Sequence, residues 1–163
     1  MENIKETTLC YMIDGNLWLM LHRNTNKDDL NYDKWLGVGG KLKEDELPKE
    51  CILREIKEET NLDALDVLYR GVVHFKQDTY EEVMYVYTCS KFSNTLDKCD
   101  EGEFKWVDKK DILSLNLWEG DKYFLQKLLS DDMNKFEILL EYDIDGNLIY
   151  ASDGGTVWIN QLL

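Results

Sequence analysis

The stretch from Gly40 to Leu62 constrains the fold more than any other part of the chain. Pro48 suits the first turn of a helix, where its missing N–H is no loss. Asn61 tolerates the left-handed conformation in which helices often end. We therefore predict a helix between these two residues. At about 100° per residue, one arc of about 100° on its wheel contains three glutamates: Glu55, Glu58 and Glu59.

The same arc carries the apolar residues Leu47, Cys51, Ile52 and Ile56. A solvated acidic stripe should lie opposite the apolar one, because water and core lie on opposite sides of a surface helix. Unpaired ions resist desolvation at several kcal/mol each, and one arginine cannot neutralise three carboxylates. A divalent cation could, and clustered carboxylates suit Mg²⁺ or Mn²⁺. The wheel leaves one alternative open, a charged surface helix with ordinary i,i+4 pairs such as Arg54 with Glu58. Leu53 falls on the outer side, which predicts that the helix is covered on more than one face.

The spacing of these residues decides between the two interpretations. A glycine is followed after five residues by a glutamate, and after seven more by Arg-Glu-aliphatic-x-Glu-Glu-x-x-aliphatic. This pattern resembles the Nudix box. The matching residues are Gly40, Glu46, Arg54, Glu55, Ile56, Glu58, Glu59 and Leu62. Asn61 stands where the family usually has glycine, a mild departure because Asn also adopts the left-handed conformation.

The resemblance implies a fold, a reaction and a set of roles. The fold is an α/β/α sandwich of the α+β class, with a mixed β-sheet and a loop–helix–loop formed by the box. The family hydrolyses nucleoside diphosphates linked to another moiety, by attack of water on phosphorus with Mg²⁺ or Mn²⁺ bound. By the motif, Glu55, Glu58 and Glu59 would face the metal, and the Gly40 carbonyl would be a further ligand. Arg54 would orient the glutamates, one of which would help to deprotonate water.

Beyond the box, the chain resembles the MutT-like, 8-oxo-dGTP diphosphatase branch from about Thr7 to the C-terminal hairpin. The segment Trp35-x-Gly-x-Gly-Gly-Lys-Leu leads into the box and supplies Lys41 to the substrate. Glu101 lies shortly before Trp106, where branch members often add an acidic group to the metals. The segment from Leu117 to Phe124 resembles the one that lines the purine pocket.

In that segment, Trp118 could stack on a base and Asp121 could hydrogen-bond a purine edge. The alternatives are a core tryptophan and a helix N-cap aspartate. Leu36 stands at a substrate position where some members place an amide that reads the base, and an aliphatic side chain cannot make those hydrogen bonds. The pair of adjacent aspartates found in some animal members is here Gly120-Asp121. Arg23 has two interpretations, a contact to a substrate phosphate or a charge at the rim.

The rest of the chain reads as strands with two further helices, which fits a sandwich. Strands are predicted at 7–13, 17–21, 66–76, 83–92, 104–107, 136–142 and 147–150, and helices at 109–115 and 120–130. Hairpin turns are predicted at Asp14-Gly15-Asn16 and at Asp145-Gly146. The polar stretch 24–34 is predicted to be a mobile loop over a pocket. We expect residues 1–163 to form a single domain.

The net charge of −14 limits the partners. Such a chain repels nucleic-acid polymers and anionic membranes, and it accepts a small anionic nucleotide only with cations between them. No apolar run approaches a transmembrane span, and the start of the sequence lacks the features of a signal peptide. The four cysteines show no paired spacing, which indicates free thiols in a reducing compartment. We therefore expect a cytoplasmic protein, either a monomer or a homodimer.

The function that the resemblance favours is a Mg²⁺-dependent nucleoside triphosphate pyrophosphohydrolase. It would release a monophosphate and pyrophosphate, with oxidised purine nucleotides such as 8-oxo-dGTP as preferred substrates. One alternative keeps the chemistry with another substrate: a nucleotide sugar, a dinucleoside polyphosphate or a modified pyrimidine triphosphate. A further alternative is a nucleotide sensor without activity. The three glutamates argue against a sensor, because a sensor has little reason to keep mutually repelling carboxylates on an apolar face.

Overall fold

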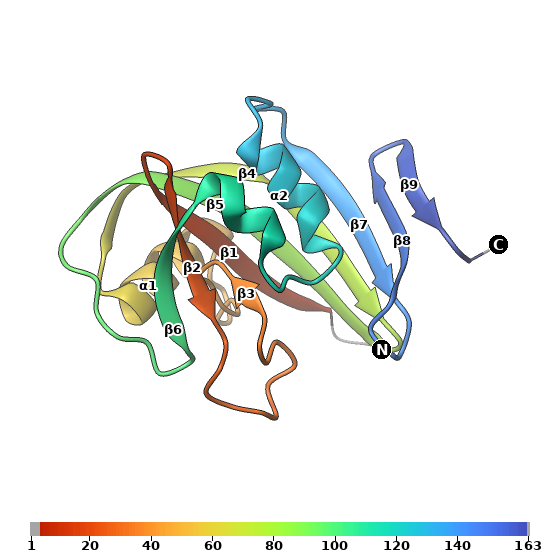
Figure 1. Ribbon diagram of the computed structural model, residues 1–163, viewed down its shortest axis with the longest axis horizontal. Coiled ribbons are helices and arrows are strands. Elements are labelled where there is room, and N and C mark those ends of the chain that lie inside the picture. Colours follow the sequence, from red (N-terminus) through yellow and green to blue (C-terminus); the bar gives the residue numbers. More distant parts are fainter. Residues whose placement is uncertain (1–3, 163) are drawn as a thin grey trace.

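The computed structural model describes residues 4–162, and Figure 1 shows how its strands and helices are arranged. The strands are β1 (Lys5–Asp14), β2 (Leu17–His22), β3 (Trp35–Leu36), β4 (Asp63–Gln77), β5 (Tyr80–Ser93), β6 (Glu103–Asp108), β7 (Phe136–Tyr142), β8 (Leu148–Asp153) and β9 (Thr156–Asn160). The helices are α1 (Pro48–Thr60), a 3₁₀ helix η1 (Lys109–Ser114) and α2 (Asp121–Leu129). The strand order is β3-β2-β1-β5-β4-β7-β8-β9, and β6 pairs with β2. Parallel and antiparallel pairs occur in the same sheet.

Strand β1 divides the core in two, because alternate side chains point to opposite faces of a sheet. Cys10 and Met12 pack with α1, whereas Leu9 and Tyr11 pack on the face that α2 covers. Figure 1 shows the two helices on opposite sides of the strands. The predicted α/β/α sandwich of the α+β class with a mixed sheet is confirmed.

The strands of the first hairpin, β1 and β2, separate beyond their turn, and the glycine segment lies in the space between them. β2 pairs with β1 only next to the turn, and its far end pairs with β3 instead, whereas β6 pairs with β2 along its whole length. The vacated side of β1 is taken by the glycine segment, through bridges from Cys10 to Val38 and from Thr7 to Lys41. Gly39 and Gly40 therefore lie between β1 and α1.

Helix α1 begins and ends where the sequence predicts. The Glu50 carboxylate accepts the Leu47 N–H at 2.9 Å, which satisfies one free donor of the first turn. Asn61 ends the helix in the left-handed conformation, at φ 66°. The expectation that the helix is covered on more than one face is wrong. Leu53 is 39% exposed, and Glu50 and Lys57 on the outer side of α1 are exposed as well.

Other differences lie near the C-terminal half. The predicted helix at 109–115 is the 3₁₀ helix η1, and β9 was not predicted because its strand signal is short. Cys10, Cys51 and Cys89 are buried free thiols, as expected. Among residues 4–162, no helix combines the length and apolar character that a membrane crossing requires.

Candidate active site

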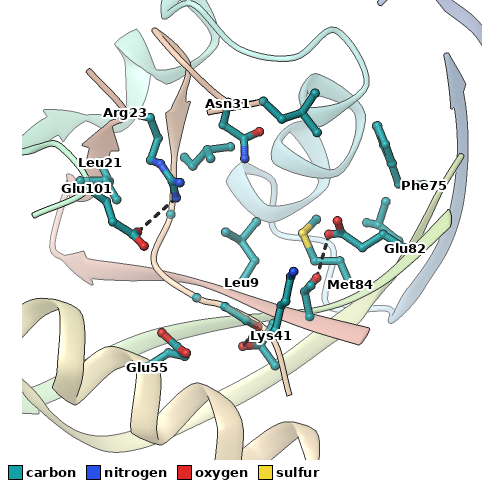
Figure 2. Close-up of a pocket in the computed structure, with 18 of the residues that line it drawn as sticks. Leu9, Leu21, Arg23, Asn31, Lys41, Glu55, Phe75, Glu82, Met84 and Glu101 are labelled. Atoms are coloured by element: carbon teal, nitrogen blue, oxygen red, sulfur yellow. Dashed lines mark hydrogen bonds and ion pairs between the residues drawn. The ribbon is translucent and has the colours of Figure 1, made fainter. Parts of the chain in front are cut away.

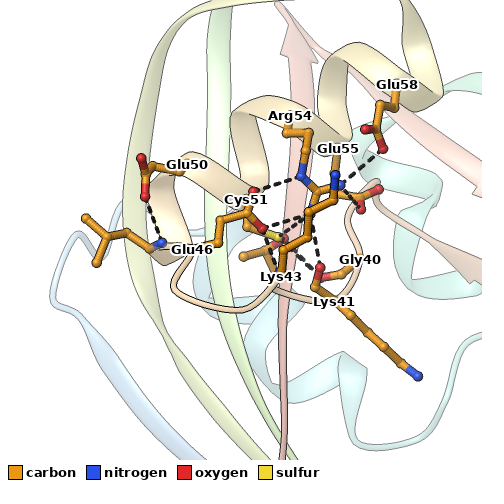
Figure 3. A network of polar contacts seen from close by, with 11 residues as sticks. Gly40, Lys41, Lys43, Glu46, Glu50, Cys51, Arg54, Glu55 and Glu58 are labelled. Carbon is orange, nitrogen blue, oxygen red and sulfur yellow. Dashed lines mark hydrogen bonds and ion pairs between the residues drawn. The ribbon is translucent and has the colours of Figure 1, made fainter.

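Arg54 organises the start of the site by joining the glycine loop to α1 (Figure 3). Its Nε and Nη2 each donate to the Glu46 carboxylate at 2.8 Å, in a bidentate pair. Its Nη1 donates to Glu55 at 2.8 Å and to Glu58 at 3.1 Å. Its Nη2 also donates to the Lys41 carbonyl at 3.1 Å. Arg54 is held by charge-assisted hydrogen bonds, which are stronger and more directional than neutral ones.

These contacts change the pKa of neighbouring acids in opposite directions. Hydrogen bonds from Arg54, and from the Lys43 N–H, lower the pKa of Glu46 to about 2. Burial raises the pKa of Glu55, and the Arg54 guanidinium opposes that rise. Glu46 is therefore a structural counter-ion of Arg54, whereas Glu55 remains a poorly solvated carboxyl beside the glycine loop.

Glu59 is the most perturbed acid of the helix. Burial is the main reason that its pKa is raised to about 9, and the adjacent carboxyl of Glu101 adds to the rise. The Gly39 N–H donates to its Oε2 at 3.0 Å and partly offsets this. Two carboxyls so close cannot both ionise readily unless a cation joins them.

A cavity of about 710 Å³ opens between these acids and the sheet (Figure 2). Its acidic end contains Glu55, Glu59, Glu101 and Arg23, and its other end is lined by aromatic side chains. Figure 2 shows Arg23 and Glu101 on one side and Phe75 and Glu82 on the other. All five residues predicted to bind substrate line this cavity: Arg23, Leu36, Lys41, Trp118 and Asp121.

The loop 24–34 forms part of the cavity wall. The Trp118 indole N–H donates to Asn31 Oδ1 at 2.8 Å. Arg23 pairs with Asp29 at 2.8 Å and with Glu101 at 3.1 Å. Arg23 is thus a partly buried link between the loop and the acidic end. The phosphate contact and the rim charge both stay predictions for this residue.

Comparison with known proteins identifies the family. A family model described as the NUDIX domain matches residues 4–128, which is most of the chain. The chain belongs to the Nudix family.

Two curated Nudix relatives are distant. An uncharacterized Nudix hydrolase, YvcI, from Bacillus subtilis (strain 168) is 26% identical over 101 residues, or 58% of this chain and 64% of that protein. The oxidized purine nucleoside triphosphate hydrolase of Mus musculus is 28% identical over 99 residues, or 59% of this chain and 63% of that protein. In both cases, the match spans slightly less than two thirds of the relative's length.

Solved Nudix structures share the fold. A mutator MutT protein from Bacillus halodurans has a TM-score of 0.82 at 22% identity, covering 92% of this chain and 97% of its own. The NUDIX domain of NrtR from Shewanella oneidensis, solved with ADP ribose, has a TM-score of 0.66 at 17% identity, covering 78% of this chain and 88% of its own.

The acids of the Nudix box have the chemistry that a divalent ion prefers, but their carboxylates do not converge on one point in this structure. Among residues 4–162, no three His, Cys, Asp or Glu side chains lie in an arrangement that could hold a metal ion. The reason is that Arg54 holds Glu55 and Glu58, while Glu59 faces Gly39 and Glu101. Nudix hydrolases generally use divalent metal ions. Carboxylate oxygens are the ligands that hard cations prefer, and the raised pKa of Glu59 beside Glu101 marks a place where positive charge is favourable.

Two predicted ligands differ from the rest of the metal set. The Gly40 carbonyl accepts the Thr8 N–H at 2.9 Å, and the Thr8 hydroxyl and the Cys51 thiol also donate to it, at 3.4 and 3.6 Å. It therefore faces β1 and the start of α1, where protein donors already bond it. Glu58 is 52% exposed and lies beside the cavity instead of lining it. Their roles as metal ligands stay predictions.

The end of the cavity that aromatic side chains line contains both Trp118 and Asp121. The Trp118 ring lies edge-to-face against Phe75 and Tyr142, and the Lys34 ammonium lies 5.3 Å from its centroid. The alternative of an N-cap aspartate is wrong, because Gly120 caps α2 and Asp121 is the first residue inside the helix. Asp121 instead lines the cavity. Burial, and then the charge of Glu82, raise the pKa of Asp121 to about 7.

This raised pKa predicts a pH-dependent stability difference for Asp121→Asn. An unfolded aspartate releases its proton near pH 4, whereas folded Asp121 holds it until about pH 7. Asp121 therefore favours the folded state at low pH, and this contribution is lost as the pH rises through that window. We expect the free energy of unfolding of Asp121→Asn, relative to the parent, to rise from about pH 4 to about pH 7 and then level off. Urea unfolding at several pH values measures it, with the exposed Asp131→Asn as the baseline.

Several residues that line the cavity were not predicted from the sequence: Thr7, Asn31, Phe75, Tyr80, Glu82 and Met84. In β5, Tyr85 and Tyr87 pack on the α1 side. Glu82 and Met84 alternate with them and therefore face the cavity. That alternation was the available signal, but it does not say which face of the strand holds the site.

Proposed function

We propose that this protein is a Mg²⁺- or Mn²⁺-dependent nucleoside triphosphate pyrophosphohydrolase that releases a monophosphate and pyrophosphate. The observation that carries the proposal is the single cavity that joins the Nudix carboxylates to Trp118 and Asp121. A nucleotide has the same two-ended chemistry, with anionic phosphates at one end and a flat base at the other. Oxidised purine nucleotides such as 8-oxo-dGTP are the preferred substrates. The mouse relative, an oxidized purine nucleoside triphosphate hydrolase, supports this choice.

Each lining group has a role in this reaction. Glu55, Glu58, Glu59 and Glu101 would hold the metal, which lowers the pKa of bound water and neutralises charge on the phosphates when bound. Arg54 fixes the orientation of Glu55 and Glu58 through the hydrogen bonds described above. A carboxylate oxygen of Glu55 or Glu58 accepts the proton of the attacking water. Lys41 and Arg23, which line the cavity, contact the phosphate oxygens.

At the other end, Trp118 stacks on the base and Asp121 bonds its edge. A carboxyl that titrates near neutral pH can donate or accept, so Asp121 suits a base edge that differs between ordinary and oxidised purines. We also propose that residues 1–163 form one domain, because β7–β9 continue the sheet beyond the matched residues. The protein would be cytoplasmic, and a monomer or a homodimer.

A panel of nucleotides tests the proposal. It contains dGTP, 8-oxo-dGTP, ATP, a nucleotide sugar, a dinucleoside polyphosphate and a modified pyrimidine triphosphate, each with Mg²⁺ and with excess chelator. We expect kcat/KM for 8-oxo-dGTP to exceed that for dGTP by roughly tenfold or more, because hydrogen-bonding sites discriminate strongly. The products should be the monophosphate and pyrophosphate, and chelation should abolish turnover.

The other outcomes separate the alternatives. Equal rates for dGTP and 8-oxo-dGTP would remove the sanitising role. Faster turnover of another member of the panel would favour that substrate class. Binding without turnover of any compound would favour a nucleotide sensor.

A further inference from the structure

Glu82 is an acid of the cavity that the proposed reaction does not use. It lies in β5 beside Met84, away from the acidic end (Figure 2). Two hydroxyl groups hold its carboxylate. Thr7 Oγ1 donates to Oε2 at 2.8 Å, and Tyr80 Oη donates to Oε1 at 2.6 Å. The side chain is thus fixed from both sides in a wall that also contains Phe75 and Leu9.

The Glu82 carboxylate has hydrogen-bond acceptor positions left for a ligand. A carboxylate only accepts hydrogen bonds, and its two oxygens offer about four lone-pair positions. The two hydroxyls occupy one position on each oxygen, which leaves one on each. Among residues 4–162, no Lys, Arg or His forms an ion pair with this carboxylate. A partly buried acceptor without a cation favours a ligand that brings N–H donors.

One acceptor position left on each of the two oxygens favours a particular kind of donor. Two parallel N–H groups can bond one oxygen each, as in bidentate recognition of a carboxylate. Among the common bases, guanine presents such an edge, with its ring N1–H next to its 2-amino group. Adenine and cytosine place a ring acceptor next to their amino group, and uracil and thymine flank their ring N–H with carbonyl oxygens. Those acceptors would face the carboxylate and be repelled.

We propose that Glu82 is a specificity-determining residue that selects bases with a guanine-type edge by accepting from N1–H and from the 2-amino group. The inference rests on the proposed function in one respect, namely that a nucleotide base enters this end of the cavity. It names the base that the site prefers. Oxidation at C8 leaves this edge unchanged, so Glu82 selects guanine and 8-oxoguanine alike, and discrimination between them belongs to other groups such as Asp121.

Two monophosphates that differ by one amino group test this directly. GMP carries the 2-amino group and IMP lacks it, and neither has an anhydride to hydrolyse. Their dissociation constants are measured by isothermal titration calorimetry with the full chain. We expect the parent to bind GMP about tenfold or more tightly than IMP, the usual size of one charge-assisted hydrogen bond. In Glu82→Gln the ratio should fall to within about twofold, because the amide turns a donor toward one of the two N–H groups.

The matched control is Glu81→Gln. Glu81 precedes Glu82 in β5, and its carboxylate pairs with Lys76 at 3.9 Å on the other face of the strand. The Glu81→Gln variant removes the same charge and should keep the parent's ratio of affinities for GMP and IMP. If Glu82→Gln is not folded by circular dichroism, Glu82→Asp replaces it, since the shorter side chain withdraws the carboxylate from the base and should also lose the preference.

Equal affinity of the parent for GMP and IMP would overturn the inference. A ratio preserved in folded Glu82→Gln or Glu82→Asp would also overturn it. Loss of the ratio in these variants and in Glu81→Gln alike would show a general charge effect and overturn it as well. The proposed function fails separately, if no triphosphate is hydrolysed. A preference for GMP that depends on Glu82 would then still stand.

Discussion

Glu58→Gln should lower kcat by about 10³-fold while leaving the fold intact, because a carboxylate that assists proton transfer or holds a metal has no equivalent in an amide. The side chain is 52% exposed, and its hydrogen bond from Arg54, 3.1 Å long, lies at the surface. Glutamine preserves the shape and can still accept that hydrogen bond. The loss should therefore appear in kcat and not in the melting temperature. Steady-state hydrolysis of 8-oxo-dGTP with Mg²⁺, alongside a thermal melt, measures both.

Glu50→Gln is the control for this variant. Glu50 lies in the first turn of α1, about two turns before Glu58 and outside the cavity lining, and its carboxylate accepts the Leu47 N–H. Glutamine serves equally well at this position of a capping box, so both rate and stability should stay near the parent values. Unchanged turnover in Glu58→Gln would remove Glu58 from the site, and leave the proton transfer to Glu55. A fall of similar size in Glu50→Gln would mean that the helix charge as a whole, and not its inner face, sets the rate.

The sequence predicts the site best where its determinants are local. Pro48 and Asn61 fix the two ends of α1 through backbone conformations that depend on one residue each. The arc of acids follows from helical periodicity alone. The partners of Arg54 also lie within one loop and one helix, so the network in Figure 3 is contained in a single motif.

The opposite end of the cavity depends on register and long-range pairing, which one sequence does not determine. Arg23 meets Glu101 from 78 positions away, and Trp118 meets Asn31 from 87 positions away. Glu82 reaches the cavity because β5 runs parallel to β1 and places it near Thr7. A shift of one residue in that pairing would turn Glu82 to the other face. Asp121 was predicted to lie near the base, but its raised pKa depends on burial and on Glu82, which only the folded chain brings together.

Alanine at Gly39 should lower stability, whereas alanine at Gly40 should lower the catalytic rate, although the two residues are adjacent. A Cβ at Gly39 would overlap the Thr8 carbonyl and lie 2.9 Å from Leu9 Cα, both in the backbone of the central strand β1. Backbone cannot move aside cheaply, so we expect Gly39→Ala to cost about 3 kcal/mol of unfolding free energy. For a chain of this length, that corresponds to a melting temperature lower by roughly 10 °C.

A Cβ at Gly40 would instead meet the Glu55 carboxyl, with Oε1 and Cδ both 2.6 Å away. A side chain can swing away, so the fold should survive with a melting temperature within a few degrees of the parent. The displaced carboxylate, however, loses its position beside Arg54. Misplacement of a catalytic group by about 1 Å can cost about 10²-fold, and we expect a fall of that order in kcat.

Gly155→Ala provides the reference for both variants, because a Cβ there has no atom within 4 Å. It should change neither property, and it corrects for the general effect of replacing glycine by alanine on the unfolded chain. The pair of variants separates the two roles of the glycine segment. If Gly40→Ala unfolds the protein as readily as Gly39→Ala, the segment serves packing against β1 at both positions. If Gly40→Ala keeps full activity, Glu55 does not need the position it has beside Arg54. The expected split, stability at one glycine and rate at the next, would mean that the chain passes from core to active site within a single peptide unit.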